Sequence, residues 1–338
     1  MKEIVWSSVI KALSGKRLFN SIKVFSSLLL SIIIKKNILW GIPFVVNIEP
    51  TVYCNLRCPQ CITGLGRIKR DSSSLSFENY QRFIDEFGEE IWYLLLYNQG
   101  EPFLNGQLID FIKLAKQKRI YVTTSTNGHF LSDTQSTEKL VKSGLDSIFI
   151  SLDGINQATY EKYRHGGNFQ KVIEGIKVLV KCREKLKSKT PKIIIQFLVM
   201  KHNEHQIEKI KKLKQKIGAD RLLIKTMQLE NPIDAHIFLP RAKKYNRYRS
   251  GKNNIEIKKT KNQLCHRLWY STVILSDGRV VPCCFDKNGK YCFGEMQQQT
   301  LNEIWKSDEY QKFRNKNRRA RQSIDICQNC SQGQKIFF

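Results

Sequence analysis

The sequence has few acidic residues for its many basic ones. Its 338 residues include 30 Asp and Glu against 57 Lys and Arg, which gives a formal net charge of +27. Such a charge favours anionic partners such as phosphorylated substrates, anionic membrane surfaces or nucleic acid. The basic residues are spread along the whole chain, as in KIKKLKQK and KNRRARQ, without an aromatic-rich basic motif. This pattern is typical of solvated surfaces and does not favour nucleic acid as a partner.

The sequence also lacks a long apolar run. The run VFSSLLLSIII at 24–34 has 11 residues, which is short for a bilayer-spanning helix. Lys35 and Lys36 follow it in place of a small-residue cleavage site, so the run does not resemble an export signal. The segment is either a helix packed against the protein body or an interfacial helix that contacts anionic headgroups. In the second case the residues entering the acyl boundary are Leu28, Leu29, Ile32 and Ile33.

The composition indicates a folded protein in a reducing compartment. Hydrophobic residues make up 41% of the chain and aromatic residues 10%, which excludes a disordered or fibrous class. Ten cysteines without a secretory signal point to metal binding or catalysis rather than to disulfides. We therefore expect a cytoplasmic protein, either free or peripheral at the inner face of the membrane.

From residue 43 onward, short β-rich segments alternate with helical segments. The expected strands are 44–50, 91–97, 120–125, 146–152, 192–200 and 219–227. The expected helices are 77–88, 108–118, 136–144, 169–186 and 204–218. This alternation of nearly all-apolar strands with helices predicts a parallel sheet covered by helices, and six units favour a partial (β/α)6 TIM-like barrel of α/β class.

The chain divides into four expected parts. Residues 1–40 form an apolar and basic helical segment, and residues 41–230 form the partial barrel. Residues 231–261 lack sustained periodicity and are expected to be a connector. Residues 262–338 form a small cysteine-rich domain. In a barrel of this kind the carboxyl ends of the strands carry the active site.

Three cysteines lie in the loop after the first strand, in the stretch CNLRCPQC. Cys54, Cys58 and Cys61 stand at spacings of four and three. Three thiolates can hold three irons of a cubane 4Fe-4S cluster, which leaves the fourth iron open to a small molecule. Zinc normally takes four ligands and the loop contains no histidine, so zinc requires a remote ligand and remains the alternative.

The spacing CxxxCxxC after the first strand of a β/α barrel resembles the radical S-adenosylmethionine (SAM) family over residues 43 to 230. The resemblance implies that the amino and carboxylate groups of SAM chelate the unique iron. It also implies reductive cleavage of SAM to a 5'-deoxyadenosyl radical that removes hydrogen from a substrate. Gln60 departs from the pattern, because the residue before the last cysteine is often aromatic or large and apolar next to the adenine.

Three further loops carry the resemblance. GEP, STNG and SLDG follow the second, third and fourth expected strands. Each is an ordinary turn by itself, but together they stand in the order of the family's motifs. GEP resembles the motif that holds the SAM amino group, and the other motifs imply polar contacts to the ribose or carboxylate. The residues implied as cofactor-binding are Gly100, Glu101, Pro102, Asn127, Ser151 and Arg164.

A second set of cysteines lies near the end of the chain. Cys265 is followed by Gly278 and Cys283, and a Cys-x2-Cys pair comprises Cys327 and Cys330. The set can complete an iron-sulfur cluster or a zinc site. The stretch from Cys265 to Cys283 resembles the first half of a SPASM domain, which implies a second, auxiliary 4Fe-4S cluster with four cysteine ligands. Because the chain stops at Phe338, one auxiliary cluster is expected.

The remaining cysteines have other expected roles. Cys284 adjoins Cys283 and is able to replace it as a ligand. Small buried residues are the expected role of Cys284 and Cys292. Cys182 lies in a helical pattern and is expected to fill space in the core or at the surface.

The function implied is that of a radical SAM enzyme with an unidentified substrate. An auxiliary cluster that accepts a second electron suggests two-electron oxidation, and a flavodoxin or ferredoxin is the expected reductant. The apolar and basic segment 1–40 favours a membrane-proximal lipid or envelope-sugar intermediate over a ribosomal peptide. Gln196 and Lys225 are expected to face the cavity from late strands. The rival class is a non-catalytic iron-sulfur electron carrier or a zinc-stabilised binding module.

Overall fold

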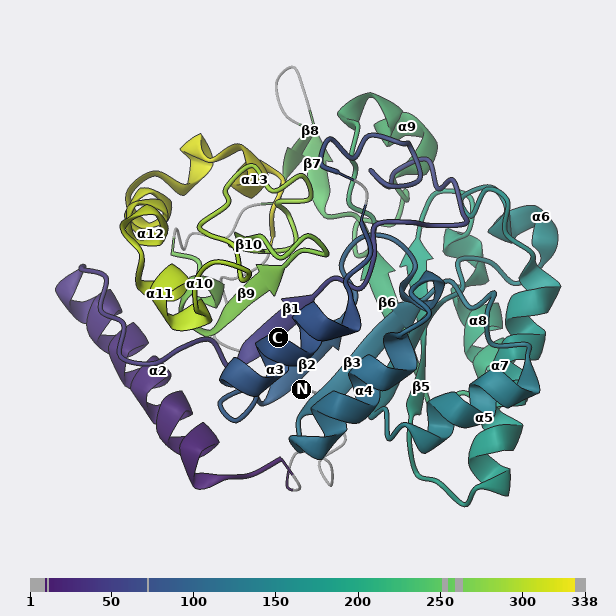
Figure 1. Ribbon diagram of the computed structural model, residues 1–338. Coiled ribbons are helices and arrows are strands. Elements are labelled where there is room, and N and C mark those ends of the chain that lie inside the picture. Colours follow the sequence, from purple (N-terminus) through teal and green to yellow (C-terminus); the bar gives the residue numbers. More distant parts are fainter. Residues whose placement is uncertain (1–9, 11, 72, 251–254, 259–263, 332–338) are drawn as a thin grey trace.

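The computed structural model describes residues 10, 12–71, 73–250, 255–258 and 264–331 of the chain. Its centre is an eight-stranded sheet in the order β10-β9-β1-β2-β3-β4-β5-β6 (Figure 1). The first six strands are parallel and follow one another along the chain. They are β1 (Val45–Ile48), β2 (Tyr93–Leu96), β3 (Tyr121–Thr126), β4 (Ser147–Ser151), β5 (Lys192–Val199) and β6 (Arg221–Thr226). The predicted partial barrel of α/β class is confirmed.

Helices connect these strands and cover one face of the sheet (Figure 1). Polar side chains at the N-caps begin three of the helices, because Ser76, Asp133 and Asn168 each accept a hydrogen bond from the backbone amide three residues on. The helices are α3 (Phe77–Phe87), α4 (Leu108–Gln117), α5 (Thr134–Lys142), α6 (Gln157–Tyr160), α7 (Phe169–Lys185) and α8 (Ile207–Lys216). The sequence predicted all of them except the short α6.

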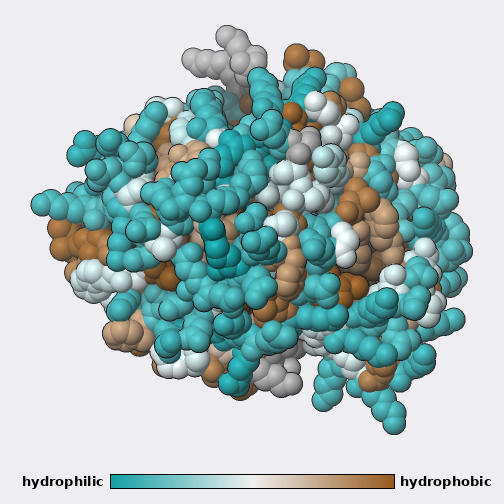
Figure 2. All heavy atoms as spheres, in the orientation of Figure 1, coloured by the Kyte–Doolittle hydropathy of each residue, from teal (hydrophilic) through white to brown (hydrophobic). Residues whose placement is uncertain are grey.

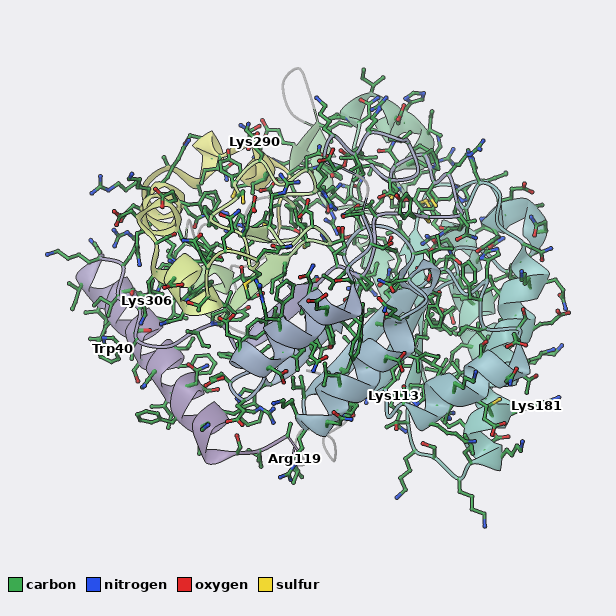
Figure 3. The ribbon with its side chains drawn as sticks, in the orientation of Figure 1. Trp40, Lys113, Arg119, Lys181, Lys290 and Lys306 are labelled. Carbon is green, nitrogen blue, oxygen red and sulfur yellow. The ribbon has the colours of Figure 1, made fainter. Side chains whose placement is uncertain are left out.

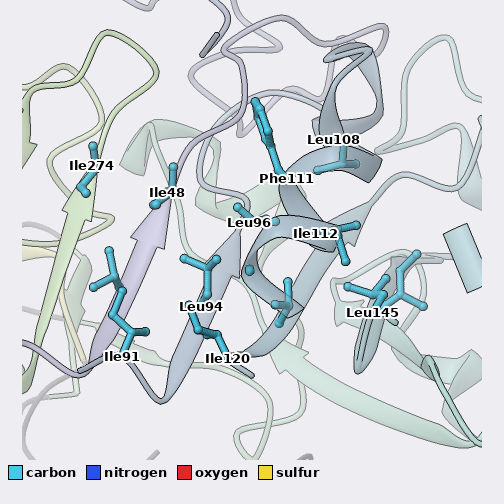
Figure 4. Packing of buried hydrophobic residues seen from close by; sticks show 14 of the residues in the cluster. Ile48, Ile91, Leu94, Leu96, Leu108, Phe111, Ile112, Ile120, Leu145 and Ile274 are labelled. Atoms are coloured by element: carbon cyan, nitrogen blue, oxygen red, sulfur yellow. The ribbon is translucent and has the colours of Figure 1, made fainter. Parts of the chain in front are cut away.

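The hydrophobic core lies between the sheet and this layer of helices. Leu94 and Leu96 of β2 are fully buried and belong to one cluster with Phe111 and Ile112 of α4 (Figure 4). Because side chains alternate along a strand, the residues between these face the other side of the sheet. That second face is available for a site.

Helix α2 (Gly15–Ile34) precedes the barrel and lies at its outer side (Figure 1). By length and composition it is the one helix among the described residues that could cross a membrane, a test that buried core helices and N-terminal signal sequences also pass. The expectation that this segment is too short to span is wrong, because the helix begins well before the apolar run at 24–34. Leu28, which the interfacial alternative placed in the acyl boundary, is instead buried in the core.

Residues 231–261, expected as a connector, contain regular structure where they are described. A short 3-10 helix, η3 (Pro232–Asp234), leads into α9 (Ala235–Phe238). The strands β7 (Tyr248–Ser250) and β8 (Ile255–Ile257) then form an antiparallel pair. Residues 251–254 and 259–261 of the expected connector lie outside the described residues.

The C-terminal region continues the barrel sheet. Strand β9 (Ser271–Ile274) pairs in parallel with β1, and β10 (Val280–Val281) pairs antiparallel with β9. The helices of this region are α10 (Arg267–Tyr270), α11 (Leu301–Lys306), α12 (Asp308–Ala320) and α13 (Asp325–Gln328). The cysteine-rich region is therefore joined to the barrel by backbone hydrogen bonds at the edge of β1.

Candidate active site and auxiliary cysteine site

The loop after β1 brings the first three cysteines together. Cys58 is buried, whereas Cys54 and Cys61 are partly exposed. The amide of Cys61 donates to the Cys58 carbonyl over 3.2 Å. Gly64 closes the loop, because a Cβ at this position would stand 2.5 Å from the Cys58 nitrogen. The glycine therefore lets the chain fold back tightly over Cys58.

The surroundings of Cys54 and Cys58 raise the pKa values of their thiols. Burial raises the pKa of Cys54 to about 11, although the Leu56 amide donates to its Sγ over 3.5 Å. Burial also raises the pKa of Cys58, and the charge of Arg164 opposes this rise. Both thiols are therefore neutral in the metal-free protein near neutral pH. Metal ligation needs thiolates, so loading the site would release protons.

The three thiols do not form a site for a single ion. Among the described residues, no three His, Cys, Asp or Glu side chains converge closely enough to hold one metal ion. Thiolates on one zinc ion stand about 3.8 Å apart, as zinc-sulfur bonds of about 2.3 Å in a tetrahedron require. An iron-sulfur cube spreads its ligands over several metal atoms. Three thiols that do not converge on one point, without a fourth ligand among the described residues, fit such a cluster better than they fit zinc.

Arg164 lies against the cysteine loop. Its Nη1 donates to the Cys58 Sγ over 3.8 Å, and its Nε and Nη2 reach Oδ2 of Asp153, each over 2.6 Å. Asp153 is fully buried, and its Oδ1 accepts from the Leu198 amide of β5. Burial lowers the pKa of Arg164, but its interactions with Asp153 and Cys58 outweigh burial and raise it well above its ordinary value. Arg164 is thus a fixed cation beside Cys58, and its predicted contact with SAM stays a prediction.

The motif after β2 packs on the cysteine loop. Gly100 has a φ of +72°, and a Cβ there would stand 2.4 Å from the Thr51 carbonyl oxygen, so only glycine fits. The amide of Glu101 donates to the Tyr53 carbonyl over 2.7 Å. Pro102 begins a 3-10 helix, η1 (Pro102–Leu104). The predicted motif therefore contacts Tyr53, the residue that precedes Cys54.

Glu101 directs a buried carboxyl group into this site. Its oxygens accept hydrogen bonds from the Thr126 hydroxyl over 2.8 Å and from the Asn127 amide over 2.7 Å. Burial raises the pKa of Glu101 to about 7, and these hydrogen bonds oppose the rise. A nearby amino group that donates to this carboxylate would favour its ionised form.

Asn127 links the third strand loop to the cysteine loop. Its Nδ2 donates to Oδ1 of Asn55, between the first two cysteines, over 2.7 Å. His129 holds Asn127 in turn, since the Asn168 amide donates to the His129 Nε2 over 2.8 Å. The ring proton must therefore be on Nδ1, which stands 2.9 Å from the Asn127 Oδ1. Sequence reasoning missed His129, whose only signal is its position two residues after Asn127.

Polar side chains line the face of the sheet opposite the core. Ser151 at the end of β4 is paired in register with Gln196 of β5, and Leu198 is paired with Lys225 of β6. Ile195, the residue before Gln196 on β5, packs in the helix-covered core. Because side chains alternate along a strand, Gln196 faces the opposite side of the sheet. No hydrogen bond to the Ser151 hydroxyl is found within the described part of the chain. The buried Ser151 hydroxyl thus has no partner among these residues. The strand register places Gln196 and Lys225 on the face opposite the core, and that they line a cavity stays a prediction.

The hydrogen bonds of the Gln60 side chain account for its departure from the family pattern. Its Oε1 accepts from the amides of Glu230 and Asn231, over 2.7 and 3.1 Å. Its Nε2 donates to Asp234 over 2.5 Å. The side chain is buried and attaches the cysteine loop to the segment after β6. A large apolar residue here would leave these backbone donors without a partner.

The second cysteine set gathers around α12 and α13. Burial lowers the pKa of Arg321, but nearby Cys265, Cys330 and Cys327 outweigh burial and raise it. The Nη2 of Arg321 donates to the Cys330 Sγ over 3.6 Å. Asn317 accepts from the Cys265 amide and donates to the Cys327 Sγ over 3.7 Å. Neither Arg321 nor Asn317 belongs to a motif that would predict its contact with these cysteines.

Cys283 completes this set. Burial raises its pKa well above the ordinary value, with further increases from the charges of Cys284, Cys330 and Cys265. Burial raises the pKa of Cys327 to about 12, against the lowering effect of Arg321. These mutual effects place the four cysteines in one region of the structure. No three of the described ones converge closely enough to hold a single ion, and their role as auxiliary ligands stays a prediction.

The other three cysteines are not among the predicted ligands. Cys182 is buried in the main core, as expected. Cys292, expected to be buried, is exposed, and its Sγ contacts the Gly294 carbonyl over 3.4 Å. Cys284 is half-buried beside Cys283.

A buried ion pair joins the barrel to the C-terminal region. Glu49, at the end of β1, pairs with Arg70, and both side chains are almost fully buried. Glu49 also accepts from the Ser276 hydroxyl over 3.0 Å and from the Asn98 side chain over 3.0 Å. Arg70 donates to the Lys287 carbonyl over 3.1 Å. This cluster fixes the cysteine loop relative to the auxiliary cysteines.

Two family models match the chain. Residues 48–215 match the model described as the Radical SAM superfamily, and residues 265–331 match SPASM, described as an iron-sulfur cluster-binding domain. The chain is 26% identical over 300 residues to the tungsten-containing aldehyde ferredoxin oxidoreductase cofactor-modifying protein of Pyrococcus furiosus, covering 79% of this chain and 82% of that protein. It is 28% identical over 178 residues to the AdoMet-dependent heme synthase of Methanosarcina barkeri, covering 52% of this chain and 48% of the relative.

Solved structures share the fold. BtrN in complex with AdoMet and 2-DOIA superposes with a TM-score of 0.55 at 17% identity, covering 88% of this chain and 96% of that one. Streptococcus suis SuiB bound to S-adenosylmethionine superposes with a TM-score of 0.61 at 15% identity, covering 90% and 75% of the two chains. At such identities the likeness shows the fold alone.

Proposed function

Because this chain belongs to the radical SAM superfamily and carries a C-terminal SPASM domain, we propose that Cys54, Cys58 and Cys61 hold the SAM-binding 4Fe-4S cluster and that the chain abstracts hydrogen from a membrane-proximal substrate. Membership in both families implies a 4Fe-4S cluster in the barrel and an auxiliary one in the SPASM domain. The observation that carries the proposal is the three-thiol loop closed by Gly64 and faced by the buried carboxyl group of Glu101.

When bound and reduced, such a cluster supplies the electron that cleaves SAM to methionine and a 5'-deoxyadenosyl radical. The residues of the chain bind and orient SAM. Glu101 accepts hydrogen bonds from its amino group, and the hydroxyl of Ser151 and the side chain of Asn127 contact its ribose or carboxylate. Arg164, 3.8 Å from the Cys58 Sγ, stabilises the thiolate form of that ligand.

The auxiliary site takes Cys265, Cys283, Cys327 and Cys330 as ligands. Arg321 and Asn317 donate to two of these sulfur atoms. Four protein ligands leave no iron open, so this site relays an electron and does not bind substrate. With an acceptor for the second electron, the reaction is a two-electron oxidation. The reductant is a flavodoxin or ferredoxin, whose acidic surface complements the net charge of +27.

A lipid or envelope-sugar intermediate is the substrate class that we favour. The support is α2, which presents exposed apolar side chains close to basic ones. The protein would then work in the cytoplasm, at the inner face of the membrane. A peptide is the second candidate, because one solved structure with this fold is SuiB bound to the precursor peptide SuiA.

Anaerobic reconstitution tests the proposed chemistry. The chain should bind about eight iron atoms, as two cubane clusters require. Dithionite and SAM should then give 5'-deoxyadenosine. Cys58→Ala should abolish this product, while Cys292→Ala, at an exposed cysteine outside both sites, should leave it unchanged.

The outcomes separate the rival classes. Iron without SAM cleavage would support an electron carrier, and zinc in place of iron would support a binding module. To identify the substrate class, the enzyme is given either a polar-lipid extract or a soluble peptide fraction from deuterium-labelled cells. The deuterium incorporated into 5'-deoxyadenosine is then measured for each. Transfer only from a peptide fraction would contradict the lipid or sugar assignment.

A further inference from the structure

Helix α2 is inverted relative to an ordinary surface helix. The side that packs against the protein carries mainly polar residues, and the side that faces outward is apolar. The buried residues are Arg17, Asn20, Val24, Ser27, Leu28 and Ser31. The exposed apolar residues are Leu18, Phe19, Ile22, Leu29, Ile32, Ile33 and Ile34. A surface helix normally has the reverse arrangement.

The outward face is well exposed. Leu18, Ile22, Leu29 and Ile33 are between 52% and 65% exposed, and their spacing of four, seven and four residues places them in one row along the helix. Figure 2 shows apolar atoms at the left edge of the molecule, where Figure 1 places the outer end of α2. None of the described parts of the chain covers this row.

Polar contacts hold α2 flat against the body. Arg17 donates to the carbonyls of Ala12, Gly88, Lys118 and Arg119. Asn20 exchanges two hydrogen bonds with the backbone of Ile42, both 3.0 Å long. The indole of Trp269 donates to the Ser31 hydroxyl over 3.1 Å. A bilayer-spanning position would break these bonds and take Arg17 into hydrocarbon, which is costly.

Basic side chains surround the apolar row. Lys35 and Lys36 follow the last turn of α2 and are exposed. Asn37 donates to the Gln311 carbonyl over 3.2 Å, which brings α12 beside this end. The exposed basic residues of α12 are Lys312, Lys316 and Arg319. None of these five side chains forms an ion pair with an acidic side chain in the part of the chain that is described.

A groove beside α2 adds an aromatic and further lysines. It has a volume of about 620 Å³, and its lining includes Lys16, Lys23, Trp40 and Lys306, together with Glu86 and Glu90. Trp40 is half exposed. Figure 3 shows Trp40 and Lys306 near each other beside α2. Tryptophan with lysine at the border of an apolar surface is typical of residues at membrane interfaces.

We infer that the outward face of α2, with Trp40 and the basic residues around it, docks on an anionic phospholipid bilayer with the helix in the membrane plane. The apolar row enters the acyl boundary, and the lysines and Arg319 contact phosphate groups. This inference deepens the proposed membrane-proximal function and rests on it. The residues proposed to contact the bilayer are separate from both cysteine sites.

Charge selects the bilayer over a second copy of the chain. Pairing two such faces would bring Lys35, Lys36 and the basic side of α12 of one copy close to the same groups of the other. Like charges set against each other disfavour such an association. An anionic bilayer offers both the apolar layer and the opposite charge.

Flotation with vesicles tests the inference. The anaerobically reconstituted full chain is mixed with phosphatidylcholine vesicles, with or without 30 mol% phosphatidylglycerol, and centrifuged through a density gradient. The wild type should float with the anionic vesicles. Leu29→Ser with Ile33→Ser should lower the partition coefficient about a hundredfold, because two large apolar side chains no longer leave water. Lys35→Gln with Lys36→Gln should lower it about fivefold per charge, and added salt should reduce the difference.

Matched controls keep the result specific. Ile233→Ser with Ile237→Ser removes two exposed apolar residues of η3 and α9 and should leave flotation unchanged. SAM cleavage and iron content should equal those of the wild type in the α2 variants, so loss of flotation is distinguished from loss of the proposed chemistry.

Three outcomes would overturn the inference. The wild type could stay in the aqueous phase with both vesicle types. It could remain on the vesicles after a carbonate wash at high pH, which would indicate a spanning helix. Finally, light scattering could reveal a dimer in the absence of lipid that Leu29→Ser with Ile33→Ser dissociates, which would assign the face to a second copy.

Discussion

Glu101 is a carboxyl group that burial holds near the midpoint of its titration at neutral pH. Its pKa of about 7 means that the ionised form becomes less populated as the pH falls below 7. The SAM amino group donates hydrogen bonds and so favours the ionised carboxylate. Below the pKa, binding must also remove a proton from Glu101.

SAM affinity should therefore fall about tenfold per pH unit as the pH is lowered below 7. Glu101→Gln should bind SAM at least about tenfold more weakly at pH 8 and lose this pH dependence, because Gln does not titrate. Anaerobic equilibrium dialysis between pH 6 and pH 8 measures both effects. An unchanged slope in Glu101→Gln would exclude Glu101 as the titrating group.

His129 acts through Asn127. His129→Leu leaves the Asn168 amide and the Asn127 carbonyl oxygen without their ring partner. The Asn127 Oδ1 keeps the backbone amide of residue 129 as a donor, so the Asn168 amide is the group left unsatisfied, at about 1–3 kcal/mol. We expect a lower thermal midpoint and weaker SAM binding, with partial rescue of SAM binding by His129→Gln, which can both accept and donate. Equal SAM affinity in His129→Leu and the wild type would show that Asn127 is held without it.

Site residues that belong to short sequence motifs can be predicted from the sequence. Site residues that are far apart in the sequence and contact one another only in the folded chain cannot. Cys54, Cys58 and Cys61 lie within one loop, and Glu101 follows a strand end, so each is visible from the pattern. The contact of Glu49 with Ser276 joins residues 227 positions apart. No local pattern predicts such a contact, because it depends on where β9 pairs with β1.

At the scale of elements, α2 shows where local pattern and packing disagree. The apolar run at 24–34 is visible in the sequence, but the helix also includes Arg17 and Asn20, whose partners lie elsewhere in the chain. The six strands and five of their helices were predictable because each carries its own apolar periodicity. The β7 and β8 pair was not, because strands of three residues are too short to show a period.

Arg17 should decide whether α2 stays docked. Arg17→Met leaves the carbonyls of Gly88 and Lys118 without a donor and should cost about 2–4 kcal/mol of local stability. Amide hydrogen exchange in α2 should accelerate at least about thirtyfold while the strands stay protected. Lys16→Met is the matched control, since its ion pair with Glu89 is exposed. Equal exchange in the two variants would show that apolar packing alone holds α2.

At the scale of the whole molecule, we expect each of the two cysteine sites to bind its iron independently of the other. Cys327→Ser with Cys330→Ser should lower the iron content from about eight to about four atoms per chain, because one cluster is lost. Reductive SAM cleavage should persist, while oxidation of substrate should stop. Iron analysis and electron paramagnetic resonance measure the first effect, with Cys292→Ser as control. An iron content near eight in the double variant would assign the auxiliary ligands elsewhere.

The hydrogen bonds between β1 and β9 make the chain hard to shorten. A fragment that ends before β9 would expose one backbone edge of β1, next to the loop that carries Cys54. Residues such as Val46 would then have a neighbouring strand only on the β2 side. Such an open edge recruits strands from other molecules, so we expect the isolated barrel to precipitate. Removing the auxiliary region to simplify the chemistry would therefore damage the site it was meant to isolate.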